Sequence, residues 1–273
     1  NNSKNFANVR FVVTDGSLEI TKRNVTLTSA DDSKPYDGNA LTNKNVTVGG
    51  DGFVNGQGAS YNITGTITNV GTTENTFSYT LNEGTDAGNY NITTANGTLE
   101  VTPVTAKVTV TIKGHTGNQK YTGKEQKVTG YDVKEISNSL YTANDFTFSG
   151  KAEAKGTDAG TYPMNLKASD FANVSKNFTN VEFKVEDGSL TITKRDVTLT
   201  SANDSKPYDG KALTNNGVTV SGDGFVEGEG ASYDVTGSQT TVGTSDNKFT
   251  YTLNEGTSEN NYNITKAEGK LTV

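Results

Sequence analysis

The chain has 273 residues, of which only 31% are hydrophobic, and it contains no Cys, no Trp, one Met and one His. Because globular chains are usually about 45–50% apolar, the core must be small, and the lack of Cys excludes disulfides and Cys-based metal sites. A net charge of −7 argues against nucleic acid and anionic membranes as partners, and the short apolar runs predict no membrane-spanning segment.

A repeat of 172 residues organises the chain. Residues 1–101 align without a gap to residues 173–273, and 71 of the 101 aligned pairs are identical. We interpret the sequence as an excerpt from a longer polypeptide that alternates two kinds of module. The predicted segments are the C-terminal tail of a truncated long module (1–23), a first short module (24–101), a long module (102–195) and a second short module (196–273).

The first segment carries a strand pattern that its second copy explains. NVRFVVTDG at residues 8–16 recurs as NVEFKVEDG at residues 180–188, and Val9, Phe11 and Val13 are unchanged while the residues between them differ. Differences on every second residue indicate a β-strand with one packed face and one solvated face. We therefore expect these three side chains to face a core.

The first short module opens with an alternating strand and then a six-residue motif. SKPYDG occupies residues 33–38 and returns unchanged at residues 205–210. As chemistry, Lys34 could act as a nucleophile, or Tyr36 and Asp37 as an acid and base pair. No His, Cys or Gly-x-Ser-x-Gly element stands nearby to complete such a site.

The same motif fits a turn better. Pro35 fixes its own φ, Asp37 can accept a hydrogen bond from the following backbone, and Gly38 supplies a positive φ. We predict a turn in which Tyr36 buries its ring and hydrogen-bonds through its hydroxyl.

The connections between modules are short. They read TKRN at residues 21–24, TP at residues 102–103 and TKRD at residues 193–196, and the apolar positions change parity across each of them. A shift of one residue turns the apolar set to the opposite face. We expect neighbouring modules to be rolled about a common axis and held stiffly, which would build a rod.

The long module resembles the short one at low resolution. Residues 108–124, VTVTIKGHTGNQKYTGK, parallel residues 25–39, and GTDAGTY at residues 156–162 parallels GTDAGNY at residues 84–90. Both modules therefore appear in the sequence as variants of one ancestral unit.

Strand-forming residues and turn signals at intervals of about 8–12 residues run through the chain. Only residues 132–146 are predicted to hold a helical turn, capped by Thr142 or Ser139. We predict an all-β fold of tandem small sandwiches, immunoglobulin-like or β-grasp-like, arranged end to end.

These motifs resemble a known family. KPYDG, followed by VTV, GDGF, VGT, YTLNEG and AGNYNIT, is similar to the YDG/MBG repeats, which are β-rich, glycine-rich repeats of large bacterial surface proteins. The resemblance implies a secreted, wall-associated or adhesin-like protein with modules in tandem, and it implies neither a ligand nor catalytic residues. The long module departs from the pattern with KYTG at residues 120–123, where Thr122 would poorly replace an essential Asp37 carboxylate.

Other candidate sites are weaker. His115 is the only His, in a Gly-flanked stretch, and we expect an exposed loop residue rather than a metal ligand. The acidic loops at residues 29–33, in GDGF and at residues 227–230 could bind Ca²⁺, but no known calcium-loop pattern is present, so we favour solvated turns. The Asn-x-Ser/Thr triplets occur by chance in so Asn-rich a chain and include those at Asn24, Asn45, Asn91 and Asn263.

A Lys–Asn isopeptide cross-link is a further hypothesis for a Cys-free surface module. It requires a Lys, an Asn and a carboxyl group together in a dry core. The conceivable members are Lys34 or Lys206 with Asp37, Asp209, Glu83 or Glu255.

We expect a non-catalytic stalk of an extracellular, Gram-positive cell-wall adhesin, whose partners are the neighbouring repeats of the same chain. The alternative is a module that binds host glycans, mucin or a host protein through loops of the long module, where Tyr131 and Tyr141 would stack on sugars. We predict no catalytic, cofactor-binding or metal-binding residue, because no nucleophile, base and oxyanion site occur together.

Overall fold

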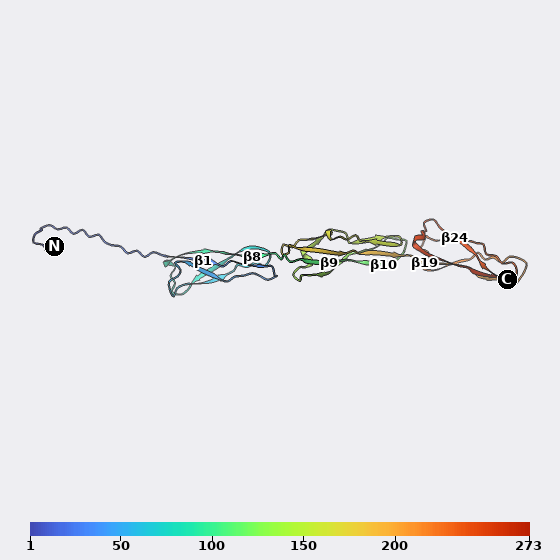
Figure 1. Ribbon diagram of the computed structural model, residues 1–273, viewed down its shortest axis with the longest axis horizontal. Coiled ribbons are helices and arrows are strands. Elements are labelled where there is room, and N and C mark those ends of the chain that lie inside the picture. Colours follow the sequence, from blue (N-terminus) through green and yellow to red (C-terminus); the bar gives the residue numbers. More distant parts are fainter. The chain divides into compact units, whose positions relative to one another are not determined.

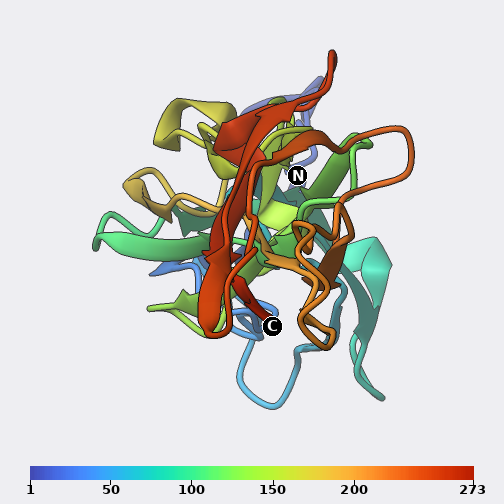
Figure 2. The ribbon, with the colours of Figure 1, turned by 90° about the vertical axis from the view of Figure 1, so that its right-hand side faces the viewer.

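The computed structural model describes residues 1–273 and is all-β, without a closed barrel. By its internal contacts the chain forms two compact units, residues 1–105 with 176–179 and residues 106–175 with 180–273. The module boundaries drawn from the repeat stay predictions. Figures 1 and 2 show the strands of both units in sequence colours.

The first short module is built from three small sheets, with strand orders β3–β1–β7, β2–β8–β5 and β4–β6. Both three-stranded sheets contain one parallel pair, β1 with β7 and β2 with β8, which the antiparallel sheets of an immunoglobulin sandwich lack. The strands are β1 (Arg23–Ser29), β2 (Asp32–Pro35), β3 (Val46–Gly50), β4 (Ala59–Ile63), β5 (Gly71–Asn75), β6 (Phe77–Leu81), β7 (Tyr90–Ala95) and β8 (Gly97–Thr102).

The core of this module comes from its two central strands. Val25 and Leu27 of β1, and Leu99 and Val101 of β8, are each at most 1% exposed. Their alternation with exposed or half-buried residues confirms the predicted strand faces.

The expectation for the first segment was wrong. Phe11, Leu18 and Ile20 are 71%, 92% and 90% exposed, and residues 8–20 belong to no strand. Their counterparts in residues 180–192 form strands only by pairing with three strands of the long module. Residues 8–20 have no such partners in this chain, so their apolar face is not covered.

The long module repeats the plan of the short one. Its three-stranded sheets have the orders β12–β9–β17 and β10–β18–β15, again with parallel pairs β9 with β17 and β10 with β18. It has two two-stranded pairs, β11–β14 and β13–β16, where the short module has one, β4–β6. The strands are β9 (Val108–Gly114), β10 (Thr116–Lys120), β11 (Gln126–Thr129), β12 (Tyr131–Ile136), β13 (Phe146–Phe148), β14 (Glu153–Gly156), β15 (Gly160–Pro163), β16 (Phe171–Asn173), β17 (Val181–Glu186) and β18 (Ser189–Thr193).

The second short module, drawn in orange to red in Figure 2, has the same strand plan as the first. Its sheets are β21–β19–β25, β20–β26–β23 and β22–β24. The strands are β19 (Arg195–Ser201), β20 (Asp204–Ser205), β21 (Val218–Gly222), β22 (Ala231–Val235), β23 (Thr244–Asn247), β24 (Phe249–Leu253), β25 (Tyr262–Ala267) and β26 (Gly269–Thr272).

One predicted correspondence between the modules was wrong. Strand β15, which includes the last three residues of GTDAGTY, pairs antiparallel with β18, just as β5 pairs with β8. The strand after GTDAGNY, β7, instead pairs in parallel with β1. The two similar heptapeptides therefore occupy different places in the common plan.

The helical turn predicted in residues 132–146 is a 3₁₀ turn at Ala143–Asp145, capped by Thr142 rather than Ser139. The Thr142 hydroxyl accepts from Asn144 N, and the Asp145 carboxylate accepts from Thr142 N. Sequence reasoning missed three similar turns, at Ala87–Asn89, Ala168–Asp170 and Glu259–Asn261.

A buried polar cluster lies at the centre of each short module. Asn75 is fully buried, and its amide donates to the carbonyls of Ala30 and Asn43 at 2.9 Å each. Ser29 donates to the Asn75 carbonyl at 2.6 Å and accepts from Gly97 N at 2.9 Å. Ser201 and Asn247 repeat these contacts in the second copy, so the cluster satisfies loop backbone that would otherwise be buried without partners.

Replacing Asn75 with Ala should lower the free energy of unfolding of the first short module by about 2–3 kcal/mol, because two buried carbonyls lose their donor. Urea unfolding measures the loss, with Asn62→Ala, an exposed Asn, as the control. Equal small effects of both substitutions would show that the buried amide does not stabilise the module.

Candidate functional site at a module junction

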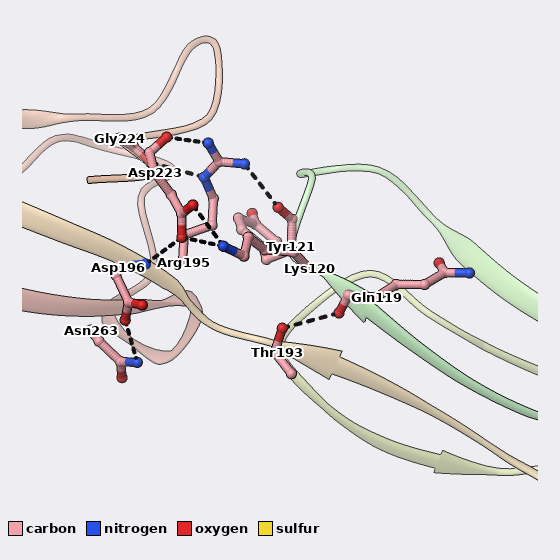
Figure 3. A network of polar contacts seen from close by, with 9 residues as sticks. All are labelled: Gln119, Lys120, Tyr121, Thr193, Arg195, Asp196, Asp223, Gly224 and Asn263. Carbon is pink, nitrogen blue, oxygen red and sulfur yellow. Dashed lines mark hydrogen bonds and ion pairs between the residues drawn. The ribbon is translucent and has the colours of Figure 1, made fainter. Parts of the chain in front are cut away.

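The long module passes into the second short module almost without a linker. β18 ends at Thr193 and β19 begins at Arg195, so a single residue separates the two strands. β10 ends beside this connection, where Tyr121 N donates to the Thr193 carbonyl at 2.9 Å and the Thr193 hydroxyl donates to Gln119 O at 3.3 Å (Figure 3). The turn after β10 is therefore held at the point where the chain leaves the long module.

Tyr121, from the KYTG motif, reaches across this junction. It is 4% exposed, and its ring packs edge-to-face on Tyr262 with the centroids 5.7 Å apart. Its hydroxyl donates to Glu229 Oε1 at 2.6 Å, while the Tyr262 hydroxyl donates to Glu229 Oε2 at 2.8 Å. One carboxylate of the short module thus binds a tyrosine from each module.

The two tyrosines remain neutral donors over the physiological pH range. Burial, followed by the hydrogen bond and charge of Glu229, raises the pKa of Tyr121 well above its ordinary value of 10.0. Burial likewise raises the pKa of Tyr262 to about 12, although the backbone N–H of Val226 opposes the shift. Both hydroxyls therefore keep the protons that bind the Glu229 carboxylate.

An ion pair and an arginine add to the junction (Figure 3). Lys120 Nζ lies 2.6 and 2.7 Å from the two carboxylate oxygens of Asp223. Arg195 donates to the carbonyls of Asp223 and Gly224, and its third nitrogen donates to Tyr121 O at 3.4 Å. Lys120, and then the backbone N–H of Asp196, hold the pKa of Asp223 below its usual value of 3.8.

The opposite side of the junction is held by a buried amide. Asn261 is 1% exposed, its side chain donates to Asp158 Oδ1 at 2.9 Å, and it accepts from Ala159 N at 2.7 Å. Asp158 and Ala159 belong to the GTDAGTY motif of the long module. Sequence reasoning did not assign Asp223, Glu229 or Asn261 to any common site, because no local pattern links them to Lys120 or Tyr121.

SKPYDG forms the corresponding turn of the short modules. Asp37 Oδ1 accepts from Asn39 N at 2.9 Å and Gly38 has a φ of 80°, which confirms the turn that these residue types predict. Tyr36 N donates to Thr102 O at 2.9 Å, as Tyr121 N donates to its own last strand. Tyr36 and Tyr121 are therefore equivalent residues at the exit of their modules.

The prediction that this tyrosine buries its ring was wrong for Tyr208 and held only in part for Tyr36. Tyr36 is half-buried, and its ring packs edge-to-face on Phe178, at 5.7 Å between centroids, within the first unit. Beside it, Val70 N donates to the side chain of Asn177 at 2.9 Å. Tyr208, the equivalent residue of the second copy, is 63% exposed, because no such segment packs on it.

The possible reactive groups of SKPYDG form an ion pair on the surface. Lys34 Nζ lies 2.7 Å from Asp37 Oδ1, which lowers the pKa of that carboxyl, and it also donates to Asn39 O at 2.9 Å. Lys206 and Asp209 form the same pair at 2.9 Å. The Asp37 side chain is 52% exposed, whereas an isopeptide cross-link requires a dry core. Glu83 and Glu255 are exposed as well.

The two tyrosines proposed to stack on sugars lie inside an aromatic cluster. Tyr141 is 2% exposed, and its hydroxyl lies 3.0 Å from both Asp145 O and Asn173 Oδ1, either of which can accept its single proton. Burial raises its pKa to about 12. Tyr131 is half-buried against Phe148 and Phe171, with centroids 4.9 and 5.2 Å away. The Tyr141 ring is therefore covered, and the Tyr131 ring is covered in part by two other rings.

The acidic loops use their oxygens on the chain itself. Asp31 accepts from Thr98 N at 2.7 Å, and Asp32 accepts from Asn43 at 3.1 Å. No group of three or more His, Asp or Glu side chains is arranged to hold a metal ion. Asn24 and Asn91 pair across neighbouring strands, as Asn263 does with Asp196, and Asn45 is exposed.

His115 is 41% exposed in its side chain and forms two polar contacts. Its Nε2 lies 3.2 Å from Asp132 Oδ1, and its Nδ1 lies 2.8 Å from Thr129 O. The hydrogen bond to Asp132, and then that to Thr129, raise the pKa of His115 above 6.5, although Lys134 opposes the shift. The imidazole thus lies on the surface between β9 and β10 and contacts Thr129 of β11 and Asp132 of β12.

Comparison with known proteins agrees with the repeat character of this region. Residues 100–194 match the family model of the MBG domain. This match supports an MBG/YDG-type repeat, and the aligned segment contains the KYTG and GTDAGTY motifs that form one half of the junction. No curated protein matches the chain. No helix of the structure is both long and apolar enough to span a bilayer.

Removing the Asp223 charge should weaken the second unit at neutral pH. Because its pKa is lowered in the folded chain, the stabilisation is present above 3.8 and is lost as the pH falls below that value. The difference in unfolding free energy between the native chain and Asp223→Asn should therefore shrink below pH 3.8. Asp51→Asn, at the equivalent position without a lysine contact, is the control, and equal effects of both substitutions would contradict the role of Lys120.

The single imidazole gives an unambiguous NMR titration. His115 should titrate with a midpoint above 6.5, and Asp132→Asn should lower that midpoint by removing the main stabilising acceptor. Lys134→Gln, which removes an opposing charge, should keep the midpoint above 6.5. A native midpoint at or below 6.5 would contradict the contact with Asp132.

Proposed function

We propose that this chain, with its MBG-type repeat, is a non-catalytic stalk segment of an extracellular bacterial surface protein. Its tandem modules would hold a distal binding domain away from the cell wall of a Gram-positive organism. The family match and the repetition support a surface protein, and the acidic, Thr-rich composition suits an exposed stalk. The chain's partners in this proposal are its own neighbouring repeats.

The junction of the second unit carries the proposal. A stalk must resist bending where modules meet, and a single residue there separates β18 from β19. Tyr121 fills the space between the modules, Glu229 binds tyrosines from both, and Asn261 closes the opposite side. Contacts on two sides of the connecting strand oppose bending in more than one direction.

The groups that suggested catalysis support the same proposal. Lys34 and Asp37 form an ion pair with each other on an exposed turn. The equivalent turn of the long module has Thr122 in place of Asp37 and therefore no such pair, and its tyrosine, Tyr121, is buried in the junction. The motif therefore supplies a corner and a tyrosine to the junction. No specific observation favours glycan binding over this role, because Tyr131 and Tyr141 are packed in the long module.

Solution scattering tests the stalk. The native chain is expected to give the profile of an elongated particle with its modules in line, and Tyr121→Ala should broaden the distribution of distances by loosening the junction. Tyr208→Ala, which removes an exposed equivalent tyrosine, should leave the profile unchanged. A compact particle with modules packed side by side would contradict the proposal.

A further inference from the structure

The N-terminal end of the first short module repeats the receiving half of the junction. Five side chains of the second short module bind the long module there, and four of the five are identical at the equivalent positions of the first. The pairs are Arg195 with Arg23, Asp223 with Asp51, Glu229 with Gln57, Asn261 with Asn89 and Tyr262 with Tyr90.

The two sets also share their internal hydrogen bonds. Arg23 donates from Nε to Gly52 O at 3.1 Å and from Nη2 to Asp51 O, as Arg195 does to the equivalent carbonyls. The Tyr90 hydroxyl accepts from Val54 N at 3.2 Å and donates to Gln57 Oε1. The side chains that bind Tyr121 in one copy are therefore already oriented in the other.

Four of these five residues line a concave site in the first unit. A pocket of about 320 Å³ is bounded by Arg23, Gln57, Asn89 and Tyr90 together with Val54, Gly88 and residues 20–22. Asp51 is outside this lining, and its backbone carbonyl is bound by Arg23. In the second copy the equivalent side chains pack against Tyr121 and the adjacent turn, and Asn261 is 1% exposed. Asn89 and Asp51 are exposed. Their equivalents at the junction of the second unit are Asn261, a buried amide, and Asp223, a carboxylate in an ion pair.

We propose that this pocket binds the Lys-Tyr turn and the Asp-Ala-Gly turn of a further long-type module. The tyrosine would enter between Tyr90 and Arg23, the lysine would pair with Asp51, and the Asp-Ala-Gly turn would bind Asn89. The inference rests on the proposed stalk and names the partner of one end of the segment.

The chain itself indicates which module this is. Residues 1–22 match residues 173–194, the segment that contains β17 and β18 of the long module, and they lead directly into Arg23. In the long module, β18 pairs in parallel with β10, which places Lys120 and Tyr121 at the junction. A long-type module completed by residues 1–22 would bring its own Lys-Tyr turn to the pocket by the same pairing.

One difference changes the chemistry of the pocket. Gln57 replaces Glu229, and its amide nitrogen donates to Gly84 O at 3.0 Å, which turns its oxygen toward Tyr90. An amide oxygen has two lone pairs and can accept a second tyrosine hydroxyl, without the negative charge. The contact with Asp51 is then the charged one at this site.

A chain extended by its own residues 102–172 in front of Asn1 tests the proposal. This addition rebuilds a complete long-type module on residues 1–22. A water-soluble carbodiimide activates a carboxylate, the Lys amine displaces the resulting urea, and an amide forms with net loss of water to the reagent. Lys120 and Asp223, 2.6 Å apart, should couple and serve as the internal control.

Mass spectrometry of the monomeric product should show a second coupled peptide, between the added copy of Lys120 and Asp51. Lys→Arg in the added copy, or Asp51→Asn, should remove that peptide and leave the Lys120–Asp223 peptide, while Asp223→Asn should do the reverse. Detection of the Lys120–Asp223 control peptide without the Asp51 peptide would overturn the proposal. An added segment whose amides exchange like an unfolded chain would also overturn it, since residues 1–22 and the pocket would not suffice to hold it.

The two proposals can fail separately. An elongated native chain without coupling to Asp51 contradicts only the pocket, whereas a compact native chain contradicts the stalk whatever the coupling shows.

Discussion

Each module depends on the parallel pairing of its second strand with its last strand. β2 pairs with β8, β10 with β18 and β20 with β26, all in parallel. Because parallel strands finish at the same edge of a sheet, the turn after the second strand lies where the last strand ends and the chain leaves the module. Tyr36 and Tyr121 fix this turn by donating from their backbone nitrogens to the last strand. Topology alone therefore places a tyrosine at the exit of the module, before any neighbour contributes a contact.

The partners of that tyrosine differ between the two units. In the first unit Tyr36 meets the ring of Phe178, so the contact is apolar and its hydroxyl is not part of it. In the second unit Tyr121 is buried more deeply and its hydroxyl requires an acceptor, which Glu229 supplies. The charge of Glu229 is in turn compensated by two tyrosine protons, and Lys120 forms an ion pair nearby with Asp223. The same corner thus serves an apolar contact in one unit and a polar one in the other.

Period-two patterns predicted the strand faces where the partner strands are present, because alternation within one strand decides which residues meet the core of the same module. Val25, Leu27, Leu99 and Val101 follow that rule. The same pattern failed for residues 8–20, which pair with no strand. The burial of Tyr36 and Tyr208 could not be predicted in this way, since it depends on whether a residue such as Phe178 packs on the turn. The Asp223, Glu229 and Asn261 contacts were missed for a related reason, because their partners lie in another module, 103 to 108 positions away in sequence. The fully buried Asn75 was also unexpected, since an isolated Asn in a polar sequence carries no local signal of burial.

The receiving surface discriminates between the turns of the two module types. Pairing with the last strand makes Pro35 equivalent to Lys120 and Asp37 equivalent to Thr122. A short-type turn at the surface formed by Asp223 and Glu229 would therefore lose the lysine and bring a carboxylate toward two others. Loss of an ion pair combined with like-charge repulsion disfavours that partner on both counts. A long-type turn supplies the cation and no carboxylate at these two positions. The alternation of short and long modules along the chain is thus matched by side-chain chemistry at their ends, which disfavours a junction between two short modules.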